Sequence, residues 1–175
     1  MRITLYGFMG SGKTLLGKRL AGKMGYNFVD LDEEIEKKAG ISISSIFKEK
    51  GEIFFRNLEH NTLKEIVKKN EQNVILALGG GTIIRPSNRE LLKVKNFKTI
   101  YLDVEIEELI KRLRNDKEKR PLLKNIENDD FSQYVKALFL TRKSVYETNA
   151  DIKISIHKEN IEQALEKIYL YLNLN

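Results

Sequence analysis

The residues best suited to chemistry stand near the start of the chain, in the run Gly-Phe-Met-Gly-Ser-Gly-Lys-Thr at 7–14. Glycines let such a loop curl so that successive backbone N–H groups point at a phosphate chain, and a helix that follows adds its positive end. Lys13 would then reach the outer phosphates, and the Thr14 hydroxyl would ligate Mg²⁺. An apolar run at 3–6 and an amphipathic pattern after the loop complete a strand–loop–helix unit. A dinucleotide-binding G-x-G-x-x-G pattern fails, because Leu15 stands where the third glycine belongs.

Two carboxylates, Asp30 and Asp32, close a second apolar run at 28–32. Residues two apart on a strand face the same side, so the pattern predicts that both side chains project together from the strand's C-terminal end. In an open parallel sheet that end is the ligand edge. The alternative is that an aspartate caps the helix that follows. A cap explains one aspartate but not the pair.

Three glycines at 79–81 end a third, continuous apolar run at 74–78. Without side chains, their backbone N–H groups could approach a ligand closely, whereas a flexible turn more often includes Asn, Asp or Ser. Arg56 and Glu59 lie three apart on a predicted helix and share a face. They form either an intrahelical salt bridge or part of a binding site.

Arg142 falls on the apolar stripe of a helix predicted at 130–147. An arginine that faces inward needs an anionic partner, because a buried, unpaired charge is very costly. The partner is either an internal carboxylate or a bound anion, and we favour the anion. Residues 111–124 add seven basic side chains against two acidic ones, and 115–130 form a long polar loop, typical of a segment that is either functional or disordered. No aromatic residues are interleaved with these charges for base stacking, so the stretch suits ATP better than nucleic acid.

Alternating apolar patterns predict the elements that must position these side chains. Strands are expected at 3–6, 28–32, 74–78, 99–103 and 151–156. Helices are expected after the first loop, in a short piece that ends at Gly40, at 42–51, in a longer piece that ends at about Lys69, after Pro86, at 106–113, at 130–147 and from 161. This alternation predicts an α/β fold, a five-stranded parallel sheet with helices on both faces. The 175 residues fit one domain, 1–175, without repeat or boundary.

Composition excludes several classes of protein. The chain has no cysteine, which rules out disulfides, thiolate zinc sites and thiol catalysis. Its two histidines are far apart, which argues against a histidine metal site. The net charge of +6 is spread over helices where lysines alternate with glutamates, so no nucleic-acid partner is expected. Without a signal-peptide pattern or a long apolar run, we expect a cytoplasmic protein that does not associate with membranes.

Together these motifs resemble the shikimate kinase family over essentially the whole chain. The resemblance rests on the loop at 7–14, Asp-Leu-Asp at 30–32, Phe55-Arg56 with Glu59, the glycines at 79–81, Arg-Pro-Leu-Leu at 120–123, and Arg142. It implies the nucleoside-monophosphate-kinase branch of P-loop proteins with strand order 2-3-1-4-5. It also implies a mobile lid at about 113–125, an acceptor-binding helical segment at about 32–60, and transfer of the ATP γ-phosphoryl group to the 3-hydroxyl of shikimate in aromatic amino-acid biosynthesis.

The resemblance also assigns roles to residues. The implied nucleotide-binding residues are Gly10, Ser11, Gly12, Lys13, Thr14, Leu15, Arg114 and Arg120. The implied acceptor-binding residues are Asp32, Arg56, Gly79, Gly80, Gly81 and Arg142. Thr14, and Asp30 through water, are implied to hold Mg²⁺. Lys13, Asp32 and Arg120 are the implied catalytic residues, with Asp32 as the candidate base. Arg114 resembles the family's adenine-stacking arginine, although Arg112 is also available, and the family's adenine-contacting segment has no recognisable counterpart at 157–159.

The constellation fits phosphoryl transfer from ATP to a small acceptor, in which catalysis is mostly positioning and charge stabilisation. A GTP-dependent switch fits less well, because the chain lacks an Asn-Lys-x-Asp run. Two alternatives remain open: a P-loop kinase of another small acid such as gluconate, and a nucleotide-dependent regulatory module without turnover. The expected partners are ATP and shikimate, and the expected state is a monomer.

Overall fold

A computed structural model of the chain describes residues 1–156 and 161–174. Its elements in chain order are β1 (Arg2–Tyr6), α1 (Lys13–Met24), β2 (Asn27–Asp30), α2 (Leu31–Ala39), α3 (Ile43–Lys68), β3 (Val74–Ala77), the 3₁₀ helix η1 (Thr82–Ile84), α4 (Pro86–Val94), β4 (Lys98–Asp103), α5 (Ile106–Asn115), the 3₁₀ helix η2 (Lys117–Lys119), α6 (Phe131–Thr148), β5 (Ile152–Ser155) and α7 (Ile161–Leu174).

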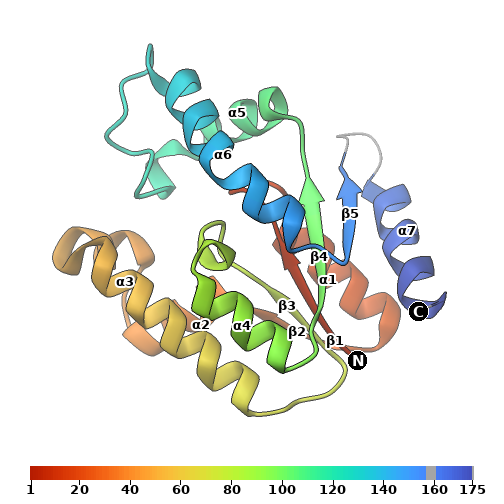
Figure 1. Cartoon of the computed structure of the whole chain (residues 1–175). Helices are drawn as coiled ribbons and strands as arrows, with labels where there is room; N and C mark the ends of the chain where they lie inside the picture. Colours follow the sequence, from red (N-terminus) through yellow and green to blue (C-terminus); the bar gives the residue numbers. More distant parts are fainter. Residues whose placement is uncertain (157–160, 175) are drawn as a thin grey trace.

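The described strands form one parallel sheet in the order β2-β3-β1-β4-β5, which confirms the predicted fold class and strand order. Every residue of β3 is buried, as expected of a central strand covered on both faces. Helices α1 and α7 pack together on one side of the sheet, and α3 and α4 pack together on the other (Figure 1). No helix of the described residues is long and apolar enough to cross a membrane.

The sheet order brings the chemical motifs to one edge. Strands β2, β3 and β1 are neighbours and run in the same direction, so their C-terminal ends meet. Asp30 ends β2, the glycines at 79–81 follow β3, and the loop at 7–14 follows β1. Ligands of open α/β sheets bind at this edge.

Asp32 does not lie on the strand, so the prediction that both aspartates project from a strand end is wrong. β2 ends at Asp30, and α2 begins one residue later. The Asp30 carboxylate accepts a hydrogen bond of 3.0 Å from the Asp32 backbone N–H, which caps the helix. Asp32 therefore reaches the same edge from the first turn of α2.

Helix α3 is broken at Gly51, where the sequence predicts a boundary between two helices. Gly51 has φ 79° and ψ 172°, a conformation that is strained for any residue with a Cβ. Ser42 caps the first piece by accepting from the Ser45 N–H. The piece before Gly51 and the piece after it thus meet at a single non-helical residue.

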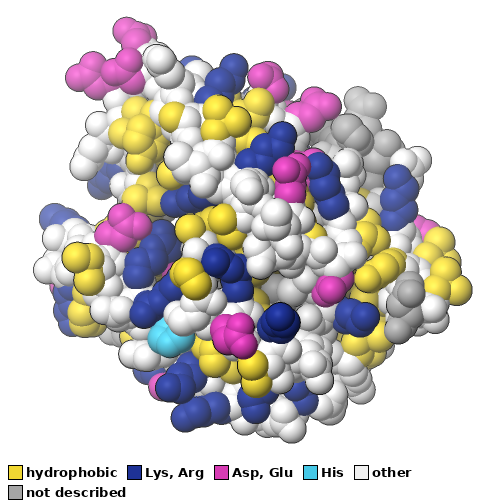
Figure 2. Space-filling model, in the orientation of Figure 1, with side chains coloured by type: hydrophobic (Ala, Val, Ile, Leu, Met, Phe, Trp, Pro, Cys, Tyr) yellow, Lys and Arg dark blue, Asp and Glu magenta, His cyan; other side chains and the backbone are white. Residues whose placement is uncertain are grey.

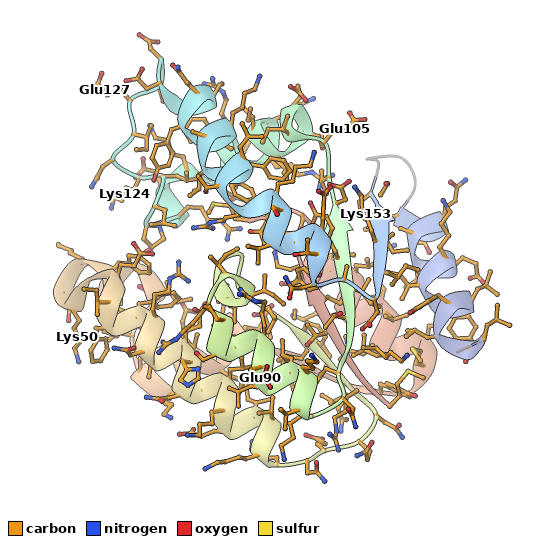
Figure 3. All side chains as sticks on the ribbon, in the orientation of Figure 1. Lys50, Glu90, Glu105, Lys124, Glu127 and Lys153 are labelled. Atoms are coloured by element: carbon orange, nitrogen blue, oxygen red, sulfur yellow. The ribbon has the colours of Figure 1, made fainter. Side chains whose placement is uncertain are left out.

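The segment that joins α5 to α6 arches above α3 (Figure 1). Its outer side chains Lys124 and Glu127 are exposed and point away from the body (Figure 3). Leu123, by contrast, is fully buried and ties the segment to the core. The segment is a cover with an apolar underside and a charged outer surface.

Candidate active site

The loop before α1 leaves the start of that helix open. Gly12 is the N-cap in a left-handed conformation, φ 89°, and no side chain caps the first turn. The backbone N–H groups of Lys13, Thr14 and Leu15 therefore lack the acceptors that a helix interior would provide. With the positive end of the helix dipole, they form an anion-binding concavity.

Lys13 lies folded over this concavity. Its Nζ donates to the carbonyl oxygens of Gly7 and Phe8 at 3.2 and 3.0 Å and to Ser11 Oγ at 3.3 Å. The pKa of Lys13 is lowered to about 8, chiefly by burial; Asp32 and Asp30 act to raise it, and Arg120 acts to lower it. A phosphate chain would supply the negative charge that this desolvated ammonium lacks.

Thr14 and Asp30 form the site's candidate metal ligands. The Thr14 hydroxyl donates to Asp30 Oδ2 at 2.6 Å, so both oxygens already lie together beside the loop. No cluster of three or more His, Cys, Asp or Glu side chains suited to a metal occurs among the described residues. Mg²⁺ does not need one, because it typically takes one or two protein oxygens and completes its shell with phosphates and water. The pair fits Mg²⁺.

The Asp32 carboxyl lies where several charges meet. Its pKa is raised to about 6, chiefly by burial and also by the nearby carboxylates of Asp30 and Glu59. Lys13 and Arg120 act in the opposite direction. A carboxylate with a pKa close to neutrality is suited to accept a proton from a substrate hydroxyl.

Other groups approach all three glycines closely: backbone at Gly80, and the ends of the Asp32 and Arg56 side chains at Gly79 and Gly81. A Cβ at Gly79 would lie 2.7 Å from Asp32 Oδ1, one at Gly80 would lie 2.9 Å from the Met9 backbone nitrogen, and one at Gly81 would lie 2.7 Å from Arg56 Nη1. Within the described chain the backbone N–H groups of these glycines have no protein acceptor. They are therefore available to a ligand, as the sequence pattern predicts.

Arg56 and Glu59 form the salt bridge that the sequence left open, and they also line a cavity. Arg56 Nη1 lies 3.2 Å from both Glu59 carboxylate oxygens, and Thr82 Oγ1 donates to Glu59 at 2.7 Å. Glu59 is only 1% exposed. Glu59 and the buried Thr82 hold the Arg56 guanidinium at the cavity wall. The two residues therefore form an intrahelical salt bridge and also line the candidate site, the two possibilities that the sequence left open.

Arg142 is buried, 9% exposed, and has no carboxylate partner in the part of the chain that the structure describes. Its Nη1 faces the Gly80 carbonyl oxygen at 3.5 Å, and its guanidinium lies 5.9 Å from the centre of the Phe8 ring. A weak hydrogen bond and a ring face do not neutralise a buried cation. The geometry therefore favours a bound anion over an internal carboxylate.

Two cavities meet at this edge of the sheet. One, of about 350 Å³, runs along the phosphate loop beside Thr14 and Asp30. The other, of about 80 Å³, is open to solvent and is lined by the following residues: Met9, Asp32, Ile43, Phe47, Phe55, Arg56, Glu59, the three glycines, Arg120, Pro121, Leu122 and Arg142. About six water molecules would fill the smaller one, the size of a small organic molecule rather than a nucleotide.

Four residues, Met9, Asp32, Gly80 and Arg120, line both cavities. Arg120 comes from the arching segment, and its Nε is buried without a hydrogen-bond partner among the described residues. A buried donor of this kind is costly unless a ligand occupies it. The shared wall is thus where a group held in one cavity would meet a group held in the other.

Arg112, rather than Arg114, lies at the phosphate loop. Arg112 Nη1 donates to the Gly10 carbonyl at 3.0 Å and lines the larger cavity. Arg114 instead donates to Ser132 Oγ at 2.8 Å and lies over the Phe131 ring, because two residues along α5 turn the side chain by about 200°, to the other side of the helix. Between the two candidates left open by the sequence, the structure brings Arg112 to the site. The segment 157–159 lies outside the described residues.

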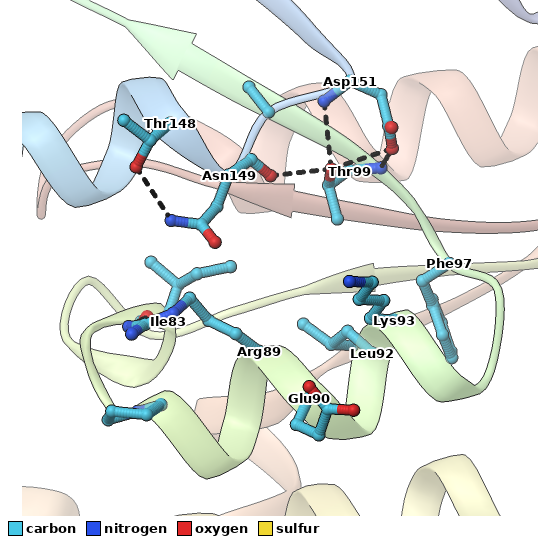
Figure 4. Close-up of a pocket in the computed structure, with 12 residues that line it drawn as sticks. Ile83, Arg89, Glu90, Leu92, Lys93, Phe97, Thr99, Thr148, Asn149 and Asp151 are labelled. Atoms are coloured by element: carbon cyan, nitrogen blue, oxygen red, sulfur yellow. Dashed lines mark hydrogen bonds between the residues drawn. The ribbon is translucent and has the colours of Figure 1, made fainter.

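A further cavity, of about 530 Å³, lies at the opposite edge of the sheet, where β4 and β5 begin (Figure 4). Its polar groups bond to one another: Thr99 Oγ1 donates to the Asn149 carbonyl at 2.9 Å, and the Thr99 N–H donates to Asp151 at 2.7 Å. Its rim carries charges of both signs, including Arg89 and Glu90. Size alone therefore does not identify the active site.

On the face shown in Figure 2, basic side chains gather around the hollow between α3 and α6.

The sequence analysis did not identify Met9 and Tyr146 as parts of this site, and it left Arg112 as an alternative to Arg114. The Met9 backbone lies close to Gly80 because β1 pairs with β3, a contact that the loop sequence does not reveal. Tyr146 lies four residues after Arg142, on the same buried face of α6 as Phe131, Val135 and Phe139. That spacing was the available signal.

A phosphate-binding loop, a carboxylate poised to take a proton, and a small arginine-rich cavity on a parallel sheet define a P-loop phosphotransferase with a small acceptor. The profile of the shikimate kinase family matches residues 9–173. A shikimate kinase of Dictyoglomus turgidum is 43% identical over 92% of this chain and 91% of that protein. The chain belongs to the shikimate kinase family.

Solved structures agree with this membership. A shikimate kinase from Acinetobacter baumannii in complex with shikimate has a TM-score of 0.90 and 35% identity, over 99% of this chain and 93% of that one. A gluconokinase from Sinorhizobium meliloti has a TM-score of 0.55 and 14% identity over 99% of this chain and 97% of its own, a likeness of fold alone.

Proposed function

We propose that this protein phosphorylates the 3-hydroxyl of shikimate with ATP to give shikimate 3-phosphate, a step of aromatic amino-acid biosynthesis. The observation that carries the proposal is the shared wall of Asp32, Gly80 and Arg120 between a loop-lined cavity and a small arginine-rich one. Phosphoryl transfer needs donor and acceptor oxygens in line. The wall is where the two would meet.

ATP binds with its phosphates on the N–H groups of the loop at 10–15 and on Lys13. The desolvated Lys13 ammonium regains a partner when the phosphates arrive, so it stabilises charge on the oxygens of the transferred group. Thr14 and Asp30 would hold Mg²⁺, which when bound supplies neutralisation of phosphate charge. Arg112, next to Gly10, takes the place on the nucleotide side that the family resemblance gave to Arg114.

Shikimate binds in the smaller cavity with its carboxylate toward Arg142 and Arg56. Arg142 has the greater need, because Arg56 already pairs with Glu59. The N–H groups of Gly79, Gly80 and Gly81 donate to the carboxylate or ring hydroxyls. Asp32 accepts the proton of the 3-hydroxyl; with a pKa of about 6 it is ionised at neutral pH. Arg120, whose Nε is unpaired, spans both substrates and stabilises the group in transfer.

The whole chain, 1–175, acts as one kinase domain with a lid at about 113–125 and an acceptor-binding segment at about 32–60. The lid carries Arg120 over the wall between the cavities, and its closure would exclude water. The chain acts as a monomer in the cytoplasm. Sedimentation with and without both substrates tests the monomer, and cell fractionation tests the location.

Release of ADP in a coupled assay with shikimate, gluconate and nucleoside monophosphates tests the function. Activity with shikimate and background rates with the others are expected. Preferred turnover of gluconate would make the chain a kinase of another acid, and tight ATP binding without turnover of any acceptor would make it a regulatory module.

A further inference from the structure

We infer that Tyr146 is a positioning residue for the phosphoryl acceptor, because its hydroxyl fixes the Gly80–Gly81 peptide at the wall between the two cavities. The inference rests on the proposed function, in which Gly80, Gly81 and Arg142 contact the acceptor. The Tyr146 hydroxyl donates to the Gly80 carbonyl oxygen at 2.5 Å. Burial raises the pKa of Tyr146 to about 12, although neighbouring Arg142 lowers it, so the hydroxyl keeps its proton and remains a donor at neutral pH.

The Tyr146 ring itself packs against two other buried tyrosines. It stacks on Tyr101 at 5.4 Å between ring centres and lies 6.2 Å from Tyr6, and the three rings are at most 1% exposed. The Tyr6 hydroxyl donates to the backbone oxygen of Tyr146 at 2.8 Å. Strands β1 and β4 thus fix the last turns of α6, and the hydroxyl of Tyr146 is presented to Gly80 by rigid elements.

The peptide that Tyr146 holds would otherwise be among the freest in the fold. Glycines on both sides allow it to rotate, since neither residue has a Cβ to restrict it. In a planar trans peptide the N–H of Gly81 points opposite to the carbonyl of Gly80. Because the carbonyl is held toward α6, the N–H of Gly81 faces away from α6, and it has no protein acceptor among the described residues. A flipped peptide would present an oxygen where an anionic acceptor needs a donor.

The same carbonyl also faces Arg142, at 3.5 Å from Nη1. Tyr146 and Arg142 lie four residues apart on α6 and converge on one oxygen. The hydroxyl therefore fixes two acceptor-binding groups at once: the donor of Gly81 and, through the shared oxygen, the guanidinium of Arg142. We expect its loss to weaken acceptor binding without affecting the nucleotide.

The test compares Tyr146→Phe with Tyr6→Phe, a matched control that removes a hydroxyl from the same stack without touching Gly80. Shikimate dissociation constants are measured by calorimetry, ATP KM by coupled assay and Tm by circular dichroism, with Arg142→Lys as a reference for the acceptor site. Tyr146→Phe should weaken shikimate binding by roughly three- to ten-fold, the loss expected for one hydrogen bond, and leave the ATP KM within about two-fold. Tyr6→Phe should lower Tm and leave shikimate affinity within about two-fold.

The other possible results of these measurements also discriminate between the inference and its alternatives. If Arg142→Lys weakens shikimate binding and Tyr146→Phe does not, the proposed site stands and the inference is overturned. Equal losses for Tyr146→Phe and Tyr6→Phe would mean that packing of the stack is responsible, which also overturns it. If none of the variants weakens shikimate binding, the acceptor site itself is misplaced. The wild-type protein gives a second measurement: ¹⁵N relaxation should show a rigid Gly81 amide without ligand, and a mobile one would refute the inference.

Discussion

Replacing Asp32 by asparagine should lower turnover and raise stability at the same time. The substitution keeps the shape of the side chain and removes its ability to ionise. A general base contributes roughly 10²–10⁴-fold, so kcat with shikimate should fall by that factor while the ATP KM changes little. Because the pKa of Asp32 is about 6 in the folded protein, kcat/KM of the wild type should decline as the pH falls through 6, and the variant should lose this limb.

The effect on stability follows from the same carboxyl. Its pKa rises from 3.8 in the unfolded chain to about 6, so ionisation is penalised only in the folded state. The free energy of unfolding should therefore fall as the pH rises from about 4 to about 6 and then stay level. The full shift corresponds to about 3 kcal/mol, which the partial exposure of the side chain reduces. We expect Asp32→Asn to gain about 1–2 kcal/mol at pH 8, a Tm higher by about 2–8 °C.

The assay is paired calorimetry and steady-state kinetics from pH 4.5 to 9, with Glu33→Gln as the control. Glu33 is adjacent and exposed, and it pairs with Lys18 on the surface. Its substitution should change neither kcat nor the acid limb. An unchanged acid limb in Asp32→Asn would refute the assignment of the base, and a lower Tm at pH 8 would refute the electrostatic reasoning. If saturating Mg²⁺ restores kcat, Asp32 is chiefly a metal-site residue.

The other predictions concern the lysine of the loop, the buried arginine and the lid. Lys13→Ala should abolish turnover with a Tm close to that of the wild type, measured by coupled assay and circular dichroism, because its ammonium is desolvated and contributes little packing. Arg142→Ala should raise the shikimate dissociation constant about 30-fold or more by calorimetry, and Arg142→Lys should weaken shikimate more than ATP, because a lysine loses the planar fork. Trypsin should cut residues 115–125 readily, after Lys117 and Lys124, and more slowly with an ATP analogue plus shikimate, as followed by mass spectrometry.

Each of these has a result that contradicts it. Near-normal turnover of Lys13→Ala would contradict the phosphate-loop assignment. A ligand-free Arg142→Ala protein that melts much earlier, with unchanged shikimate affinity, would make that arginine structural. Equal cutting by trypsin with and without ligands would contradict closure of the lid.

The parts of the fold that depend on local sequence could be predicted. The phosphate loop, the break at Gly51 and the cap at Gly40 each follow from a glycine at a position where the backbone adopts a positive φ. Alternation gave the parallel sheet, whereas the strand order came from the family resemblance, since alternation alone does not distinguish the possible crossovers. Burial of Arg142 followed from its place on an apolar stripe.

The sequence predictions failed where the position of a side chain depends on where a strand ends or on a contact between residues distant in sequence. Asp32 was expected on a strand because strand and helix patterns overlap over two residues, and the cap made by Asp30 ends the strand earlier. The choice between Arg112 and Arg114 depends on the rotation of α5 against Gly10, more than 100 residues away. The role of Tyr146 depends on an aromatic stack built from three elements that are distant in sequence. The periodicity of apolar residues carries no information about such long-range contacts.

The break at Gly51 places the residues proposed to bind the acceptor on two separate helical segments of α3. Ile43 and Phe47, which set the shape of the small cavity, lie before the break, whereas Arg56 and Glu59, which set its charge, lie after it. A change in the backbone angles of Gly51 would move Ile43 and Phe47 together relative to Arg56 and Glu59, whereas Phe55, which packs on Phe47 at 4.8 Å between ring centres, lies on the same side of the break as the charged pair. Part of the cavity's shape can therefore change without moving its arginines, and a variant kinase for a larger acid would be sought first among substitutions at 43–50, with every arginine retained.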